Sequence, residues 1–217
     1  MALALFDLDD TIIADDCTVL WNRRMVDLGW VDDSRFLERC DEMTKAYHAG
    51  TLSMESYMTL TLKPLVGREA GSVRKEVEAF IEEAIAPVVL SDALRRIAEH
   101  RARGDKLVMI SASPAYLVEP IARYVGIDDA LSIQTEVVDG RYTGNTQGIM
   151  TFRDGKIHRL RQWLEEVGGT MDGASFYSDS SNDLPLLQLV SHPHVVNPDA
   201  ALAEHARLAK WPVLHWS

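Results

Sequence analysis

The sequence predicts an α/β protein in which helices flank a mostly parallel β-sheet. Three observations support this fold class. Short apolar runs end in polar residues, as in residues 2–8, and buried parallel strands have this pattern. Segments with helical spacing separate these runs. A block without strand pattern, residues 14–87, follows the first run. Alternating strands and helices favour a parallel sheet covered on both faces.

The first predicted strand covers residues 2–8, and the second is the apolar run at residues 105–111. The segment 91–103 has helical spacing and precedes the second strand. A further helix is expected to open at Ser113-Pro114, because proline is favoured in the first turn of a helix.

A hairpin is predicted next, because residues 132–138 and 141–150 flank Asp139-Gly140, a strong signal for a tight turn. Residues 156–167 carry apolar side chains at helical spacing. The remaining predicted elements are two strands and two helices, in the order 174–178, 183–190, 194–196 and about 199–208.

Residues 14–87 contain about four helical segments between the first two strands. Such a block is expected to cover the C-terminal edge of the sheet, where open α/β sheets bind ligands. We therefore predict a catalytic core formed by residues 1–13 and 88–217, with a helical cap formed by residues 14–87.

The chain has 217 residues and a formal net charge of −11, which argues against a nucleic acid or an anionic membrane as its main partner. No apolar run approaches the roughly 20 residues that span a bilayer. The apolar N-terminus lacks a basic region and runs straight into acidic residues, so we do not expect a signal peptide. We expect a cytoplasmic protein with two reduced cysteines, Cys17 and Cys40.

Carboxylates gather where two predicted strands end. Asp7 and Asp9 point to one side of the first strand, since strand side chains alternate in direction. Asp179 and Asp183 follow the strand at 174–178. Carboxylates this close repel each other unless a cation lies between them. Mg²⁺ prefers such oxygen ligands, so the sequence predicts a magnesium site.

A phosphate site is predicted beside these acids. Ser111, Ala112 and Ser113 end the second strand at a helix start, where hydroxyl and backbone N–H groups suit a phosphate. Lys156 can supply a positive charge to the same edge. The local site can therefore attract an anion although the protein is acidic.

These motifs together resemble the haloacid dehalogenase-type (HAD) phosphatases over essentially the whole chain. Residues 6–11, FDLDDT, match the DxDxT signature of that superfamily. Ser111 matches its second motif, Lys156 its third, and Asp179 with Asp183 its fourth. The helical insert after the first motif, and the hairpin, resemble subclass IB, with phosphoserine phosphatase and histidinol-phosphatase-like members. This resemblance implies a Rossmann-like core with an inserted small helical-bundle cap of the C1 type.

The resemblance also implies roles in catalysis. Asp7 would attack phosphorus and form an aspartyl-phosphate. Asp9 would protonate the leaving alcohol and then activate water, while its backbone carbonyl binds Mg²⁺. Asp179 would complete the metal site with Asp7, and Asp183 would orient Lys156 or a metal-bound water. Ser111 and Lys156 would hold the phosphoryl oxygens, with N–H groups near Ala112 and Ser113.

The substrate prediction rests on the cap. By resemblance, Asp16 would bind a substrate ammonium, and Asn182 is a further substrate-binding candidate. The position expected to carry a carboxylate-binding arginine falls near Thr61, and no arginine lies between Arg39 and Arg68. Because an arginine fork is the natural partner of a carboxylate, its absence favours a phosphorylated amino-alcohol, with histidinol phosphate as the leading candidate.

Several alternatives remain open at the level of sequence. Lys63, Arg23 or Arg24 could reach the pocket and favour phosphoserine instead. An alcohol rather than water could take the phosphoryl group, which would make the protein a phosphotransferase. A non-catalytic binding protein on the same fold is the third alternative. The partner is expected to be a small phosphorylated metabolite, and the sequence does not indicate an oligomeric state.

Overall fold

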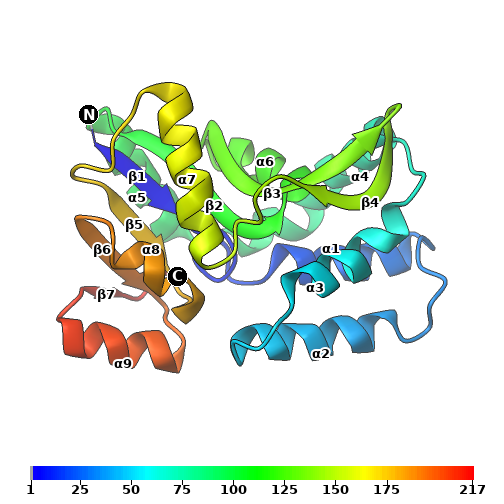
Figure 1. Ribbon diagram of the computed structural model, residues 1–217, viewed down its shortest axis with the longest axis horizontal. Helices are drawn as coiled ribbons and strands as arrows, with labels where there is room; N and C mark the ends of the chain where they lie inside the picture. The colour runs from blue at the N-terminus through cyan, green and yellow to red at the C-terminus, as the bar shows by residue number, and fades with distance from the viewer. Residues whose placement is uncertain (1) are drawn as a thin grey trace.

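The computed structural model describes residues 2–217, apart from the side chain of His48. Met1, the first residue of the predicted core segment 1–13, lies outside the described residues. The predicted fold class is confirmed, because seven strands form one sheet with helices on both faces (Figure 1). The strand order is β4-β3-β2-β1-β5-β6-β7, and every neighbouring pair is parallel except β3 with β4.

Strands β1 to β6 follow predicted segments with differences at their ends, whereas β7 was not predicted. Their bounds are β1 (Leu3–Phe6), β2 (Lys106–Pro114), β3 (Asp129–Val138), β4 (Arg141–Gln147), β5 (Ser175–Ser178), β6 (His192–Val196) and β7 (Val213–Leu214). All four residues of β1 are buried, as expected of a central parallel strand. Phe6 packs into the core on one face of the sheet, whereas Leu5 packs into the core on the other.

Two groups of helices cover the two faces of the sheet. The helices α5 (Ser91–Ala102) and α6 (Ala115–Tyr124) bury apolar side chains in the same cluster as Phe6. The opposite face carries α7 (Asp154–Val167), the single turn α8 (Leu184–Leu187) and α9 (Ala200–Ala209). The sheet therefore lies between two helical layers, and the loops that follow its parallel strands lie at one edge.

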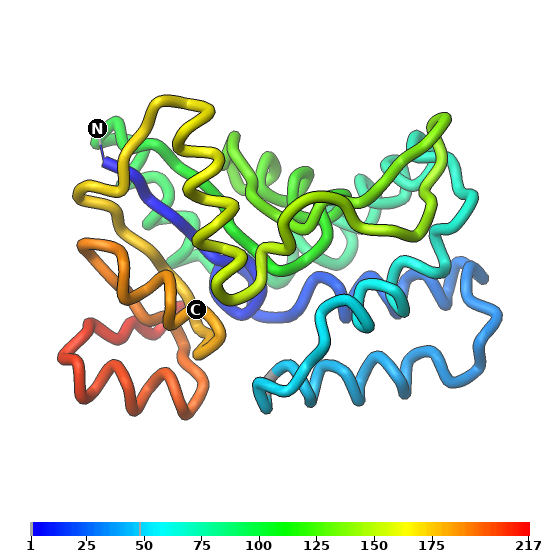
Figure 2. The backbone as a smooth tube through the Cα atoms, in the orientation of Figure 1, coloured from blue at the N-terminus to red at the C-terminus, as the bar shows by residue number. Residues whose placement is uncertain are grey.

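The predicted helical block is confirmed as four α-helices between β1 and β2. They are α1 (Cys17–Asp27), α2 (Phe36–His48), α3 (Met54–Leu62) and α4 (Ala70–Phe80), and the short turns Lys63–Leu65, Ile81–Ile85 and Ala86–Val88 complete the block. Figure 2 shows the chain leaving β1 and passing into α1, α2 and α3, which lie together at one side of the molecule. These helices stand at the end of the sheet to which β1 and β2 point.

The predicted hairpin is also confirmed, and it reaches the inserted helices. Its turn residues Asp139 and Gly140 both have positive φ angles, 50° and 75°, as a two-residue turn that matches the strand twist requires. The amide of Gly67 donates to the Tyr142 carbonyl over 2.8 Å, and the amide of Tyr142 donates to the Arg68 carbonyl over 3.0 Å. The hairpin therefore ties the inserted block to the sheet.

Several predicted boundaries were wrong. The strand β3 begins at Asp129 instead of residue 132, and α7 begins at Asp154 instead of residue 156. The strand β2 continues to Pro114, whose backbone is extended, so α6 begins one residue later at Ala115. The strand β4 stops at Gln147, before Gly148 with a φ of 70°. The predicted helix at 183–190 is a 3-10 turn at Ser181–Asp183 followed by α8. Among residues 2–217, no helix is long and apolar enough to cross a membrane.

Candidate active site

The first acidic residue continues the central strand into the loop edge. Asp7 follows β1 directly, and its amide donates to the Tyr177 carbonyl of β5 over 2.9 Å. The chain then turns at Asp10, which has a φ of 55°, and the amide of Ile12 donates back to the Leu8 carbonyl over 2.8 Å. This tight turn presents both Asp7 and Asp9 at the end of the sheet.

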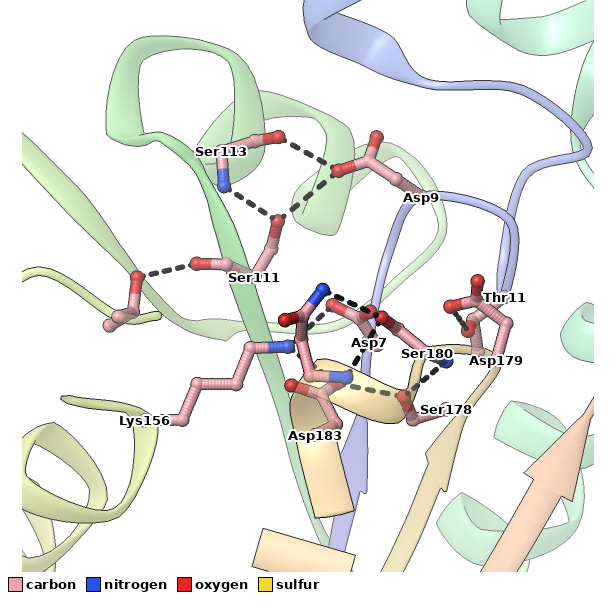
Figure 3. Close-up of polar contacts among 12 residues, drawn as sticks. Asp7, Asp9, Thr11, Ser111, Ser113, Lys156, Ser178, Asp179, Ser180 and Asp183 are labelled. Carbon is pink, nitrogen blue, oxygen red and sulfur yellow. Dashed lines mark hydrogen bonds and ion pairs between the residues drawn. The ribbon is translucent and has the colours of Figure 1, made fainter. Parts of the chain in front are cut away.

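Lys156 binds two carboxylates at once. Its ammonium donates to Asp7 Oδ1 over 3.0 Å and to Asp183 Oδ2 over 2.7 Å. Ser178 at the end of β5 donates to the same Asp183 oxygen over 2.7 Å. Figure 3 shows these side chains converging from β1, α7 and the loop after β5. The predicted grouping of Asp7, Lys156 and Asp183 is therefore present in the structure.

Asp9 is held by three hydrogen bonds from two separate parts of the chain. Its Oδ1 accepts from the Cys17 amide over 2.7 Å at the start of α1. Its Oδ2 accepts from the hydroxyls of Ser113 and Ser111 over 2.8 and 3.4 Å (Figure 3). These contacts fix one carboxylate beside the loop that is predicted to bind phosphate.

The segment 111–113 at the end of β2, which we call the serine loop because the strand register shifts there, is arranged differently from the prediction in one respect. The Ser113 amide donates to Ser111 Oγ over 3.0 Å, so this N–H group already has an acceptor. Thr151 donates to the Ser111 carbonyl over 2.5 Å, and Thr18 donates to Ser113 Oγ over 3.1 Å. Both threonines support the loop, and neither was singled out from the sequence, because their distance from Ser111 along the chain gives no local signal.

Asp179 lies on the other side of the site. Its Oδ1 accepts from Thr11 Oγ1 over 3.1 Å, which links the loop after β5 to the turn after β1 (Figure 3). Its carbonyl accepts from the Asp199 amide over 2.9 Å. The acidic residues of the two loops are therefore held at the same edge of the sheet, as predicted.

The site concentrates negative charge in a buried region. Burial raises the pKa of Asp7, and the carboxylates of Asp183 and Asp9 raise it further, against the opposing charge of Lys156. Burial and the carboxylates of Asp7, Asp10 and Asp183 raise the pKa of Asp179 well above its usual range. A cation placed among these groups would favour their charged forms.

The donor set fits the predicted Mg²⁺. Asp7, Asp179 and Asp183 supply only oxygen ligands, which Mg²⁺ prefers. Asp183 Oδ1 is buried and has no hydrogen-bond partner in the described part of the chain, so it is available to a metal-bound water. Among residues 2–217, no three histidine, cysteine or acidic side chains stand close enough to hold a metal ion as they are arranged.

A cavity between the inserted helices and the sheet edge opens onto these acids. Its lining joins the aspartates of the sheet edge to polar and apolar side chains of the inserted helices. The lining residues are Asp7, Asp9, Asp10, Asp16, Thr18, Met43, Thr44, Tyr47, Leu52, Met54, Tyr57, Ala112, Ser113 and Asp179. No lysine or arginine occurs among these described lining residues.

The three basic residues that could have reached this cavity lie elsewhere. Lys63 lines a separate cavity beside Trp30, and Arg23 lines another with Asn22. Arg24 forms ion pairs with Glu76 and Glu83, at 3.6 and 3.0 Å. The side chains that could have bound a substrate carboxylate are therefore directed away from Asp7.

The candidate substrate-binding residues differ in their placement. Asp16 lines the cavity and caps α1, where its Oδ1 accepts from the amides of Thr18 and Val19 over 2.7 and 2.9 Å. Burial and the charge of Asp9 raise the pKa of Asp16 to about 8, against these backbone hydrogen bonds.

Thr61 does not join the cavity. It is 1% exposed, and its hydroxyl donates to the Tyr57 carbonyl within α3 over 3.0 Å. The geometry therefore gives no support to its predicted role. Asn182 lies next to Asp183, but its side chain binds other protein groups, the Tyr47 carbonyl and Arg153. Arg153 was not predicted from the sequence, because its side-chain hydrogen bonds go to Asn182 and Gly50, which are distant along the chain.

Comparisons with known proteins identify the family of this chain. The sequence profile of the haloacid dehalogenase-like hydrolases matches residues 4–188. The chain is 36% identical to a protein named histidinol-phosphatase from Neisseria meningitidis serogroup C (strain 8013), over 99% of this chain and 98% of that protein. It is 29% identical to phosphoserine phosphatase SerB1 of Mycobacterium tuberculosis (strain ATCC 25618 / H37Rv), over 98% of this chain and 70% of that protein.

Solved structures share the fold. A protein of unknown function from Bordetella pertussis Tohama I superposes with a TM-score of 0.91 at 33% identity, over 98% of this chain and 97% of the other. A phospho-aspartyl intermediate analogue of phosphoserine phosphatase superposes with a TM-score of 0.70 at 20% identity, over 99% of this chain and 92% of the other, which supports the fold alone. The chain therefore belongs to the haloacid dehalogenase-like hydrolase family, as one of its phosphatase-type enzymes.

Proposed function

We propose that this protein is a Mg²⁺-dependent phosphatase that hydrolyses histidinol phosphate through an aspartyl-phosphate on Asp7. The observation that carries this proposal is the lining of the cavity, which offers Asp16 to a cation and no described lysine or arginine to a carboxylate. We further propose that residues 14–87 act as a cap over a catalytic core made of residues 1–13 and 88–217.

The roles that we assign to Asp7 and Asp9 come from the family resemblance, and the surroundings of both residues support them. An Asp7 carboxylate oxygen attacks phosphorus, the bond from phosphorus to the ester oxygen breaks, and Asp9 gives the leaving alcohol its proton. Water then attacks the same phosphorus and gives a proton to Asp9, the bond from phosphorus to the Asp7 oxygen breaks, and inorganic phosphate leaves as the Asp7 carboxylate is restored. The hydrogen bonds from Cys17 and Ser113 hold Asp9 for both steps.

The phosphoryl group needs positive charge around it in both steps. Lys156 supplies one fixed cation, and Ser111 and Ser113 supply hydroxyls beside Ala112. The proposed metal ligands are Asp7, the backbone carbonyl of Asp9, and Asp179, with Asp183 behind them. When bound, Mg²⁺ would neutralise charge on the transferring group, which is most of what phosphoryl transfer requires.

The substrate preference follows from charge and polarity. Histidinol phosphate carries an ammonium and an imidazole but no carboxylate, so it needs no arginine. Asp16 is the acidic partner that we assign to the ammonium. Met43, Met54 and Tyr57 give the cavity an apolar side suited to a ring. The relative named histidinol-phosphatase, at 36% identity over nearly the full length, supports the same choice.

The test is a comparison of phosphate esters with Mg²⁺ present. Histidinol phosphate is expected to give a higher kcat/KM than phosphoserine, and Asp7→Asn is expected to remove turnover of both while the protein stays folded. Phosphoserine as the better substrate would overturn the substrate assignment. Activity that persists in Asp7→Asn would overturn the mechanism. An added acceptor alcohol distinguishes hydrolysis from phosphotransfer, because transfer yields a new phosphate ester.

A variant of Asp16 tests the cation contact directly. Asparagine is an equally good helix cap, so Asp16→Asn removes the charge and keeps the start of α1. We expect kcat/KM for histidinol phosphate to fall by about tenfold or more, since a buried charged pair is lost. Turnover of p-nitrophenyl phosphate, which has no ammonium, should change far less. Asp15→Asn is the matched control, because Asp15 lies outside the cavity lining.

A further inference from the structure

Arg153 connects the inserted helices to the catalytic core at the margin of the site. Its Nε donates to Asn182 Oδ1 over 3.0 Å, and its Nη2 donates to the Gly50 carbonyl over 2.5 Å. Asn182 belongs to the loop that carries Asp179 and Asp183. Gly50 belongs to the loop between α2 and α3. One guanidinium group therefore joins the inserted helical block to the loop that carries Asp179.

Further contacts beside Arg153 also join the inserted helical block to the catalytic side of the site. Asn182 Nδ2 donates to the Tyr47 carbonyl over 3.3 Å, and the ring of Tyr47 lies 5.7 Å from that of Phe152. The Arg153 guanidinium lies 4.9 Å from the centre of the Phe152 ring. A Cβ atom on Gly50 would stand 3.0 Å from Arg153 Nη2, so glycine permits this close approach. We call the loop of residues 49–53 the docking loop.

The backbone of Arg153 is held in an unfavourable conformation. Its φ of 52° and ψ of −123° lie where residues other than glycine are rarely found. Such conformations persist only where the surrounding structure imposes them, and they occur often at functional sites. The Arg153 carbonyl accepts from the amide of Lys156 over 3.0 Å, in the first turn of α7. The residue that reaches the docking loop is thus bonded to the residue that binds Asp7.

We propose that Arg153 is a positioning residue that holds the docking loop against the core and so keeps the inserted helices closed over the aspartates. Its two hydrogen bonds couple that closure to the loop of Asn182 and to the start of the helix that bears Lys156. This role extends beyond the proposed function, because it holds for any phosphate ester enclosed in the cavity.

The coupling has a kinetic consequence. If only the closed arrangement binds substrate tightly, the apparent affinity falls in proportion to the closed fraction. Loss of the guanidinium should therefore raise KM, whereas substrate at saturation restores closure and leaves kcat nearly unchanged. A residue that acted only on the chemistry of Lys156 would instead lower kcat.

Hydrogen–deuterium exchange reports on the docking loop without any substrate. The amides of Gly50 and Thr51 donate to the carbonyls of Tyr47 and Ala46 over 3.0 and 2.9 Å, so they exchange when this end of α2 opens. We expect exchange of these two amides to be about tenfold faster or more in Arg153→Met. Arg161→Met is the matched control, because Arg161 is exposed on α7 and should leave this exchange unchanged.

Arg153→Gly distinguishes loss of the guanidinium contacts from a backbone effect. Glycine accepts the positive φ without strain, and it removes the guanidinium. Both variants are expected to show fast exchange in the docking loop and a severalfold rise in KM for p-nitrophenyl phosphate, with kcat within about twofold. Native exchange in Arg153→Gly would overturn the proposal, as would a fall in kcat with unchanged KM. Neither result depends on whether histidinol phosphate is the substrate.

Discussion

Lys156 Nζ lies 2.7 Å from Asp183 Oδ2, and each of these side chains is 1% exposed. The same ammonium also reaches Asp7, 3.0 Å away. Burial lowers the pKa of Lys156, but the charges of Asp183 and Asp7 outweigh burial and raise it. The lysine therefore stays charged, and it offsets part of the negative charge that the strand ends bring together.

Removal of this ammonium should be costly for both stability and activity. In Lys156→Met, Asp7 and Asp183 remain buried without their counter-ion. Breaking a buried pair in this way costs about 3–5 kcal/mol of unfolding free energy. Urea denaturation at pH 7 measures this loss, and p-nitrophenyl phosphate turnover should be lost with it.

The matched control for this lysine is Lys106→Met. Lys106 pairs with Asp129 at the surface, and its side chain is 45% exposed. Such pairs contribute about 1 kcal/mol or less. Equal losses in Lys156→Met and Lys106→Met would contradict the buried role of Lys156.

Magnesium should stabilise the folded protein through Asp179. A ligand that binds only the folded state adds about 2.7 kcal/mol at a concentration a hundred times its Kd. We expect Mg²⁺ to raise the Tm of the metal-free protein and to restore turnover after chelation by EDTA. In Asp179→Asn, the Mg²⁺-dependent rise in Tm should largely disappear. Asp172→Asn changes an exposed acid and should show the same Mg²⁺-dependent rise in Tm as the native protein. If Asp179→Asn showed that rise too, Asp179 would not be a metal ligand.

The sequence predicted the site through residues that end strands. Asp7, Asp179 and Ser111 each stand where a buried run meets a loop, and parallel strands bring those loops to one edge of the sheet. The close spacing of carboxylates in the sequence already indicated a cation, because such groups repel each other without one. The place of Lys156 at this edge was predicted from its position after the hairpin, whereas its pairing with Asp183 and its role at the phosphoryl group came from the resemblance.

Other features depend on tertiary contacts that leave no local pattern. Arg153 has a positive φ and binds Gly50, which is 103 residues away. Thr151 supports Ser111 across 40 residues. Thr61 is a case in which the sequence predicted a contact that the structure lacks. Motif spacing placed this residue near the substrate, but its hydroxyl donates to a backbone carbonyl of its own helix. The strand β7 has only two residues, too few for alternation to be visible.

A glycine in the first turn of α7 should be essential to the position of Lys156. A Cβ atom on Gly155 would stand 1.9 Å from the Met150 carbonyl oxygen, and backbone cannot move aside easily. Gly155→Ala is expected to cost about 3 kcal/mol or more of unfolding free energy and to lower turnover, because it displaces the next residue. Gly71→Ala is the control in α4, where a Cβ atom meets open space. Its unfolding free energy should be unchanged or slightly higher, and equal losses in both variants would contradict the steric argument.

Acid should destabilise the protein partly through His194. Its ring stacks on Tyr177 with 4.5 Å between centroids and 6° between planes. Burial, with the nearby charges of Arg96, His100 and His192, lowers the pKa of His194 from 6.5 to about 4. The folded state therefore binds fewer protons than the unfolded state between these values, so this contribution is complete above pH 6.5 and is lost as the pH falls toward 4.

Phenylalanine keeps the stacked ring and cannot titrate. Between pH 7 and pH 4.5, the unfolding free energy of the native protein should fall by roughly 1–2 kcal/mol more than that of His194→Phe. A pKa difference of one unit corresponds to about 1.36 kcal/mol, and the expected fall is smaller than the full pKa difference would give because the ring is only partly enclosed. Urea denaturation at the two pH values measures this difference. His215→Gln changes an exposed histidine and should follow the native protein. Parallel curves for the native protein and His194→Phe would show that acid acts through other groups.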